Sequence, residues 1–397
     1  MGCHCSSQHR TSRFGGPLEG SASMRKFMIP ALAVALLLAA CGSGGSTPGD
    51  GSASESGSPD VSGLKTAFVY VSPVKGSLWT QAWDRAREDL ESKGAETSAV
   101  EPIPETADAT GVLNDLVSKG NKLIFATAFG YQPFVLDVAT ANPDVDFVVI
   151  GPWIQEKPRP DNVTAVASDN WAARYALGVL AAKTTKTGTL GFVAANPIST
   201  VIASINAFQL GARSVNPSIT TKVVFTGTWY DPPRATQAAQ GLAGAGADVI
   251  AQYEDSTGTL QGTEKAGVWG MGSEADGSQA APKSYLSGSV NNWIPFANEV
   301  YTASLAGTFK GADAFATIAG DGVLLGPINS SVPQDVQALA NDTLAQLGSG
   351  AIVPFTGPIK SNTGEEKLAA GETWADSVAV LDNQDFLVEG IVGNIPG

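Results

Sequence analysis

Aromatic and acidic side chains recur in the segments that directly follow β-rich runs of this sequence. Five of the eight tryptophans lie there, together with Phe129 and Tyr131. These tryptophans are Trp79, Trp153, Trp171, Trp229 and Trp293, and the acid and amide residues are Asp169, Asn170, Asp231, Glu254, Asp255, Glu274, Asp276, Asn291 and Asn292. Aromatic faces stack on planar rings, and a few polar groups inside an aromatic-walled cleft orient a ligand. These residue types indicate a site for a small planar molecule.

The segments must be positioned by strands and helices that alternate from residue 64 onward. Residues 66–71, 123–126 and 147–150 are almost wholly apolar, as strands buried on both faces of a parallel sheet are. Residues 190–193 and 249–252 repeat the pattern in the second half, which predicts two α/β lobes of similar topology. Ligands of open α/β sheets bind beyond the carboxyl ends of the strands, where the aromatic and acidic segments lie.

An export signal is predicted over residues 24–41. A basic pair at 25–26 precedes an uncharged apolar run, which is shorter than the roughly 20 residues that a membrane-spanning helix needs. The run ends in the sequence LAAC at Cys41, which resembles a bacterial lipobox, and two acyl chains on that cysteine would give a stable anchor. We therefore expect residues 1–40 to be a leader. Because a signal begins at its charged region, we expect translation to start at Met24, without residues 1–23.

Removal of this leader would limit the chemistry of the mature chain. His4 and His9 are the two histidines of the sequence, and Cys41 would be the one remaining cysteine. A His-dependent triad, a cysteine nucleophile and a His/Cys metal site are therefore not expected, and no cofactor is predicted. The full chain already carries a net charge of −14, which disfavours binding to nucleic acid. Paired carboxylates remain an enzymatic alternative, at Glu254 with Asp255 or at Glu274 with Asp276, but adjacent residues rarely flank a substrate. We therefore expect a protein that is not an enzyme.

Several of these residues also have purely structural interpretations. Trp83 has the helical spacing of a core residue, and Trp171 fits helix–sheet packing as well as it fits a site. Asp231, which precedes two prolines, is expected to cap a helix. Asp255 could equally be a helix cap.

Taken together, six stretches of the chain resemble one family. They are 78–83 (LWTQAW), 123–131 (LIFATAFGY), 205–213 (INAFQLGAR), 228–232 (TWYDP), 246–252 (GADVIAQ) and 355–360 (FTGPIK). Over about residues 65–390 the chain resembles the basic membrane protein family of lipoproteins, the substrate-binding subunits of ABC importers, which include purine-nucleoside receptors. The resemblance implies an α/β type I periplasmic-binding fold, in which two doubly wound lobes close on a ligand across a three-strand hinge. Residues 64–168 and 292–322 would form lobe 1, residues 169–291 and 323–397 would form lobe 2, and residues 41–63 would be a flexible linker.

The resemblance also implies a set of ligand contacts. Trp79 and Trp229 would sandwich a base, Asp169 with Asn170 would face it, and Phe129 and Gly130 belong to one of the shared stretches. Tyr253, Glu254 and Asp255, with Gly272, Glu274 and Asp276, would line the side where a sugar binds. Two departures lie on that side: Asn291 stands where nucleoside-binding members carry a lysine, and the acidic motif reads GSEAD at 272–276. A nucleobase or another flat heterocycle is therefore as credible a ligand as a nucleoside.

These expectations describe a monomeric lipoprotein on the extracytoplasmic face of the cell membrane. It would bind a purine nucleoside or nucleobase and pass it to an ABC transporter permease. Two alternatives on the same fold are a sugar-type solute receptor and a sensory ligand-binding protein.

Overall fold

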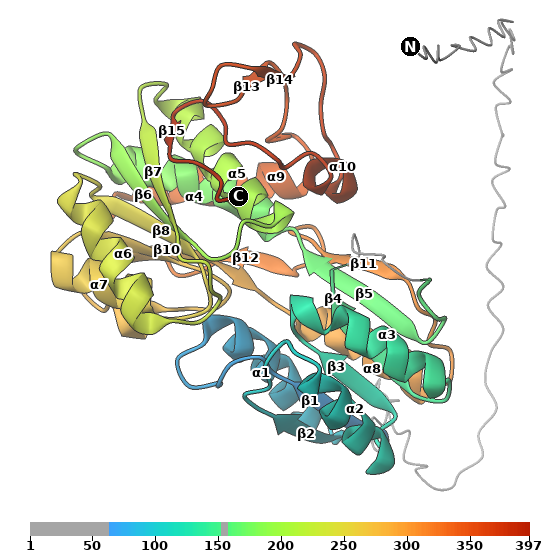
Figure 1. Ribbon diagram of the computed structural model, residues 1–397. Helices are drawn as coiled ribbons and strands as arrows, with labels where there is room; N and C mark the ends of the chain where they lie inside the picture. Colours follow the sequence, from blue (N-terminus) through green and yellow to red (C-terminus); the bar gives the residue numbers. More distant parts are fainter. Residues whose placement is uncertain (1–62, 152–157) are drawn as a thin grey trace, which may run out of the picture. The chain divides into compact units, whose positions relative to one another are not determined.

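The computed structural model describes residues 63–151 and 158–397. The predicted leader, the predicted lipid anchor at Cys41, the predicted linker up to residue 62 and Trp153 lie outside the described residues. The described residues belong to one compact unit, in which two mostly parallel sheets are covered by helices (Figure 1).

The first sheet contains six strands in the order β11-β5-β4-β3-β1-β2, all parallel. The strands are β1 (Lys65–Val69), β2 (Glu96–Val100), β3 (Leu123–Ala126), β4 (Asp146–Ile150), β5 (Val163–Ser168) and β11 (Asp313–Ala316). Its helices are α1 (Leu78–Ser92), α2 (Asp108–Ser118), α3 (Gln132–Ala141) and α8 (Ile294–Leu305), with the short helix η1 (Phe129–Tyr131). Side chains of α1 and α8 pack on one face of the sheet, and those of α2 and α3 pack on the other.

The second sheet has the order β12-β10-β9-β8-β6-β7-β15, in which only β12 is antiparallel to its neighbour. The strands are β6 (Thr189–Ala194), β7 (Thr220–Phe225), β8 (Val249–Tyr253), β9 (Trp269–Gly272), β10 (Tyr285–Asn291), β12 (Val323–Leu325) and β15 (Ile391–Val392). The helices are α4 (Asn170–Thr184), α5 (Ser199–Val215), α6 (Pro232–Gly244), α7 (Gly258–Ala266), α9 (Gln334–Gly348), α10 (Ser377–Leu381) and η2 (Ser278–Ala280), and β13 (Ile359–Lys360) pairs with β14 (Glu366–Leu368).

The same doubly wound order appears in both sheets. The strand that starts each sheet, β1 or β6, lies between the next two strands of the chain. The later strands follow on one side, except β15, which pairs with β7 at the opposite edge of the second sheet. The predicted α/β fold with two lobes of similar topology is confirmed. In such an order the ligand crevice opens at the carboxyl ends of the strands, beside the point where the winding reverses.

The chain passes between the sheets three times. It leaves β5 for α4 at Asp169, leaves β10 for α8 at Asn292, and runs from β11 to β12 through residues 317–322. The Asp169 N–H donates to the Ala316 carbonyl at 2.8 Å, and the Asn292 N–H donates to the Gly322 carbonyl at 2.8 Å. The three crossings are therefore joined by backbone hydrogen bonds.

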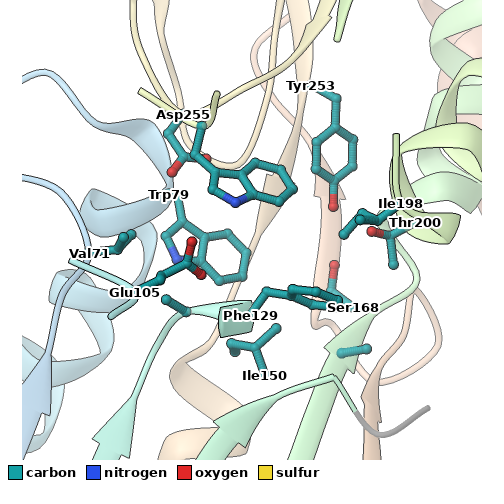
Figure 2. A pocket seen from close by; sticks show the side chains of 13 residues that line it. Val71, Trp79, Glu105, Phe129, Ile150, Ser168, Ile198, Thr200, Tyr253 and Asp255 are labelled. Atoms are coloured by element: carbon teal, nitrogen blue, oxygen red, sulfur yellow. The ribbon is translucent and has the colours of Figure 1, made fainter. Parts of the chain in front are cut away.

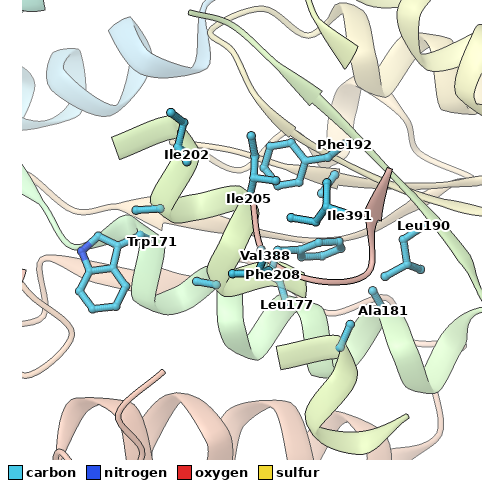
Figure 3. Close-up of a cluster of buried hydrophobic side chains, with 14 of the residues drawn as sticks. Trp171, Leu177, Ala181, Leu190, Phe192, Ile202, Ile205, Phe208, Val388 and Ile391 are labelled. Carbon is cyan, nitrogen blue, oxygen red and sulfur yellow. The ribbon is translucent and has the colours of Figure 1, made fainter. Parts of the chain in front are cut away.

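Helices α4 and α5 approach closely at two glycines. A Cβ on Gly178 would lie 2.0 Å from the Phe208 carbonyl oxygen, and a Cβ on Gly211 would lie 2.0 Å from that of Tyr175. Leu177, Phe192 and Phe208 belong to the apolar core around this contact (Figure 3). Glycine at both positions lets the helix backbones touch and buries the core of the second lobe.

Several local predictions can be compared with the structure. The Asp231 carboxylate caps α6 by accepting from the Arg234 N–H at 3.0 Å, as predicted. Trp83 is fully buried, and Trp171 is 7 % exposed within the core of the second lobe. Trp293, which we placed among the site residues, is instead fully buried and stacked on Trp83 with ring centroids 4.2 Å apart.

Candidate functional site

A pocket opens at the carboxyl ends of strands from both sheets, as the doubly wound topology predicts (Figure 2). Lobe 1 supplies Val71, Trp79, Glu105, Ala128, Phe129, Ile150, Ala167 and Ser168, and lobe 2 supplies Ile198, Thr200, Trp229, Tyr253 and Asp255. Five of the predicted site residues are thus brought together, namely Trp79, Phe129, Trp229, Tyr253 and Asp255.

Both tryptophans of the pocket are held by contacts behind their rings. Trp79 Nε1 donates to the Thr127 carbonyl at 2.6 Å. The Trp79 ring also packs edge-on against the buried Trp293 ring, with the ring centroids 5.9 Å apart. Trp229 Nε1 lies 3.1 Å from the side-chain amide of Asn196, which accepts from it when the amide oxygen faces the indole. Because these contacts fix the rings, the aromatic faces are preorganised for stacking.

Two carboxyl groups line the pocket, and Figure 2 shows both beside Trp79. Glu105 Oε1 accepts from the Gly130 N–H at 2.6 Å. Asp255 is 6 % exposed, and its side chain makes no hydrogen bond to any described residue. Burial raises the pKa of Asp255 well above its ordinary value, and the charges of Glu274, Glu254 and Glu105 raise it further. Burial also raises the pKa of Glu105, and the hydrogen bond from Gly130 opposes that shift.

Asp255 is also a point of contact between the lobes. Its carbonyl accepts from the Leu78 N–H at the start of α1, at 2.6 Å, and its own N–H donates to the Trp229 carbonyl at 2.8 Å. Beside it, the Thr257 N–H donates to the Gly76 carbonyl at 3.3 Å. The backbone that carries this carboxyl group is therefore held by both lobes.

A second polar cluster lies at the crossings, and it contains three of the predicted ligand contacts. Glu274, Asn170 and Asn291 are each at most 3 % exposed, and Arg174 is fully buried among them. The Glu274 carboxylate accepts from Asn291 Nδ2, from Asn170 Nδ2 at 3.3 Å and from the Ser273 hydroxyl at 2.9 Å. Ser168, which lines the pocket, donates to Asn291 Oδ1 at 2.8 Å.

Arg174 completes this cluster. Burial lowers its pKa to about 10, and the charge of Glu274 opposes that shift. Burial raises the pKa of Glu274, and Arg174 and the hydrogen bonds to Ser273 and Asn291 oppose it. The structure thus places the carboxylate of Glu274 against protein donors and outside the pocket wall.

The other predicted acids make contacts within their own lobe. Asp169 accepts from the Ser377 hydroxyl at 2.6 Å, and burial raises its pKa to about 6. Glu254 accepts from the Ser256 N–H at 2.8 Å and the Thr259 hydroxyl at 3.1 Å, and burial raises its pKa to about 7.

The last three predicted positions have structural contacts as well. Asp276 accepts from the Ser278 N–H at 2.9 Å. Gly272 lies at the end of β9, where a Cβ would meet the Tyr285 ring at 3.1 Å, and Gly130 donates to Glu105.

Sequence reasoning missed three polar residues of the pocket wall. Glu105 follows β2, an edge strand whose residues are mostly polar and exposed, so the apolar pattern that revealed the other strands is absent there. Thr200 follows β6, a strand that the sequence did reveal, and the rule of carboxyl ends could have found the loop. Ser168 ends β5, inside a segment already considered.

The described residues also bear on two other kinds of site. No group of three or more His, Cys, Asp or Glu side chains among them is arranged to hold a metal ion. No helix within these residues is both long and apolar enough to span a bilayer.

Comparison with known proteins assigns the chain to a family. Residues 64–354 match the family of PnrA-like ABC transporter substrate-binding proteins. A purine-binding protein of Brucella abortus is 36% identical over 336 residues, covering 84% of this chain and 94% of the relative. A putative ABC transporter glucose-binding protein of Haloferax volcanii is 30% identical over 363 residues, covering 89% of this chain and 86% of the relative.

Solved structures show the same architecture. An ABC transporter solute-binding protein from Conexibacter woesei has a TM-score of 0.63 at 22% identity and covers 73% of this chain and 98% of its own. The family acts outside the cytoplasm and works with a transporter permease on a small-molecule ligand. The Brucella and Haloferax relatives are both named as binding proteins. The predicted family is confirmed: this chain belongs to the Bmp family of PnrA-like ABC transporter substrate-binding proteins.

Proposed function

We propose that this protein is an extracytoplasmic lipoprotein that binds a purine nucleobase or nucleoside between its lobes and delivers it to an ABC importer. The observation that carries the proposal is a pocket in which both lobes supply aromatic faces, at Trp79, Phe129, Trp229 and Tyr253. Planar ligands gain stacking energy from such faces, and the acid and hydroxyl groups of the wall supply orienting hydrogen bonds. The purine-binding relative in Brucella abortus supports the same ligand class.

Equilibrium dialysis of the purified protein against purine nucleobases and nucleosides tests the ligand class. We expect retention of at least one purine, and Trp229→Ala should weaken it at least about tenfold because a stacking face is lost. Trp269→Ala is the matched control, since Trp269 is half-buried and lies outside the pocket wall. If no purine is retained, the proposed ligand class is wrong.

A sugar ligand is the second candidate, because one relative is a putative glucose-binding protein and tryptophans also stack on sugars. Adding glucose and other hexoses to the same dialysis series separates the two classes. Binding of a sugar without any purine would favour this candidate.

The lipid anchor and the delivery step need separate experiments. Cys41→Ser should move the protein from the membrane fraction to the soluble fraction, because the acyl chains would be absent. An unchanged membrane fraction would contradict the anchor. Deletion of the gene should lower uptake of the bound purine, whereas unchanged uptake would point to a sensory role.

A further inference from the structure

The carboxyl groups of Glu105 and Asp255 lie together at one end of the pocket. Figure 2 shows them on the same side of the pocket, next to Trp79, and the two groups are near enough for their charges to interact. Glu105 comes from the loop after β2 in lobe 1, and Asp255 comes from the segment after β8 in lobe 2. The pair is therefore assembled from both lobes.

The hydrogen-bonding capacity of this pair is largely unused. Glu105 Oε1 accepts from the Gly130 N–H, which leaves Oε2 with no described partner. Asp255 has no side-chain hydrogen bond to any described residue although it is 94 % buried. A buried carboxylate without donors costs free energy, so its partner is expected to arrive with the ligand.

The remaining polar groups of the pocket wall are hydroxyl groups and not carboxyl groups. Ser168, Thr200 and Tyr253 present hydroxyl groups, and Figure 2 places them on the other side of the pocket from Glu105 and Asp255. The thirteen described lining residues include no lysine, arginine or histidine. Nearby, Arg174 is turned to Ser273 and to backbone carbonyls, so it does not neutralise the pair. The pocket thus has an acceptor end and a hydroxyl end, with aromatic faces between them.

We propose that Glu105 and Asp255 together read one edge of the ligand, which must present two adjacent N–H groups or a positive charge. A ring stacked on the aromatic faces would direct its in-plane N–H groups at the two carboxyl groups. Guanine has such an edge, with N1–H beside its exocyclic amino group, whereas unsubstituted purine has a single N–H. Anionic ligands such as nucleotides are repelled by the same pair. This inference rests on the proposed function, because it concerns the ligand of the same pocket.

Isothermal titration of the full-length protein with guanine, unsubstituted purine and guanosine monophosphate tests this selectivity. We expect guanine to bind at least about 30-fold more tightly than unsubstituted purine, because a buried acceptor left unpaired costs affinity. Glu105→Gln and Asp255→Asn should each weaken guanine at least about 30-fold and remove most of the preference. Guanosine monophosphate should bind the wild-type protein weakly and gain affinity in both variants.

Glu96→Gln is the matched control, since it removes an exposed carboxylate on β2, outside the pocket. Thermal unfolding of each variant checks that it is folded. If Asp255→Asn does not fold, Glu105→Gln still tests the inference, because Glu105 is only half-buried. The inference is overturned if purines bind but both variants keep the preference of the wild type for guanine.

Two further titrations, with guanosine and with 2′,3′-dideoxyguanosine, identify a different source of adjacent donors. If guanosine binds, guanine does not, and 2′,3′-dideoxyguanosine does not, then the pair reads the sugar diol and the inference is wrong while the ligand class stands. If none of the purines binds, the proposed function itself fails.

Discussion

Arg174 Nε donates to Asn170 Oδ1 at 3.0 Å, and both side chains are buried: Arg174 fully, and Asn170 with 1 % exposed. The guanidinium also donates to the Gln252 carbonyl at 2.7 Å and to the Ser273 hydroxyl at 2.6 Å. Asn170 continues the chain of hydrogen bonds to Glu274, so an opposite pair of charges lies inside the protein at the first crossing between the lobes. Burial of such a pair is tolerated when its members are fully hydrogen-bonded.

Arg174→Met should destabilise the folded protein strongly. The substitution removes the positive charge that is linked to the buried Glu274 carboxylate through Asn170 and Ser273. Leaving a buried charge without its opposite charge costs about 3–5 kcal/mol. The loss should appear as a lower midpoint in urea unfolding, followed by fluorescence of the tryptophans.

Two further variants give this experiment its controls. Lys119→Met removes an exposed positive charge and should change the free energy of unfolding by less than about 0.5 kcal/mol. Adding Glu274→Gln to Arg174→Met should recover part of the loss, because the unpaired charge is gone. A midpoint for Arg174→Met equal to that of the wild type would contradict a stabilising interaction between the charges of Arg174 and Glu274.

The fold could be predicted from sequence because its strands are buried on both faces. Residues 123–126 and 147–150 are continuous apolar runs, and each is a central strand. Strand β2 escaped prediction because it lies at the sheet edge, where Glu96 and its neighbours are exposed. An apolar run in the sequence indicates a buried strand, so this pattern does not reveal a strand that is mostly exposed.

The site could be predicted only in part. Position after a strand sufficed for Trp79 and Trp229, because the carboxyl ends of parallel strands converge. The same rule placed Glu274 in the site, yet hydrogen bonds from Asn170, Ser273 and Asn291 hold that side chain inside the protein. No local pattern marks the nearby Arg174, in the middle of a helix, as buried. Long-range pairing of this kind becomes visible only in three dimensions.

The wild-type protein should lose stability as the pH rises from about 5 to 8. The folded pKa of Glu254 is about 7 against an ordinary 4.5, so its stabilising contribution is fully present below pH 4.5 and is lost as the pH passes 7. Full ionisation would cost up to about 3 kcal/mol by this linkage. The raised pKa of Asp169, about 6, acts in the same direction.

Glu254→Gln should therefore flatten the pH dependence of the free energy of unfolding, measured by urea titration at several pH values. Glu96→Gln alters an exposed carboxylate and should leave the slope as it is in the wild type. If the free energy of unfolding of Glu254→Gln depends on pH as steeply as that of the wild type, then ionisation of the buried Glu254 does not cause this dependence.

Trp293→Ala should cost about 3–5 kcal/mol of stability, because a large buried ring is replaced by a cavity. Its ring is stacked on Trp83 at 4.2 Å and also supports the edge of Trp79. Trp269→Ala removes a half-buried indole and should cost clearly less in the same chemical unfolding experiment. Equal losses of stability for the two variants would mean that the Trp83–Trp293 stack stabilises the protein no more than a half-buried tryptophan does.

Gly178→Ala should destabilise the second lobe, whereas Gly241→Ala should stabilise it. Both glycines lie within helices, but the added Cβ at Gly178 would overlap the Phe208 carbonyl oxygen at 2.0 Å, and at Gly241 it meets no atom within 4 Å. Pushing α4 and α5 apart costs about 1–3 kcal/mol by overpacking, whereas alanine gains about 0.5–1 kcal/mol over glycine in an exposed helix. Urea unfolding of the two variants measures both effects against the same wild type. Because the substitutions are chemically identical, opposite signs can come only from the space around each glycine, and a gain at Gly178 would show that α4 and α5 are not packed backbone to backbone.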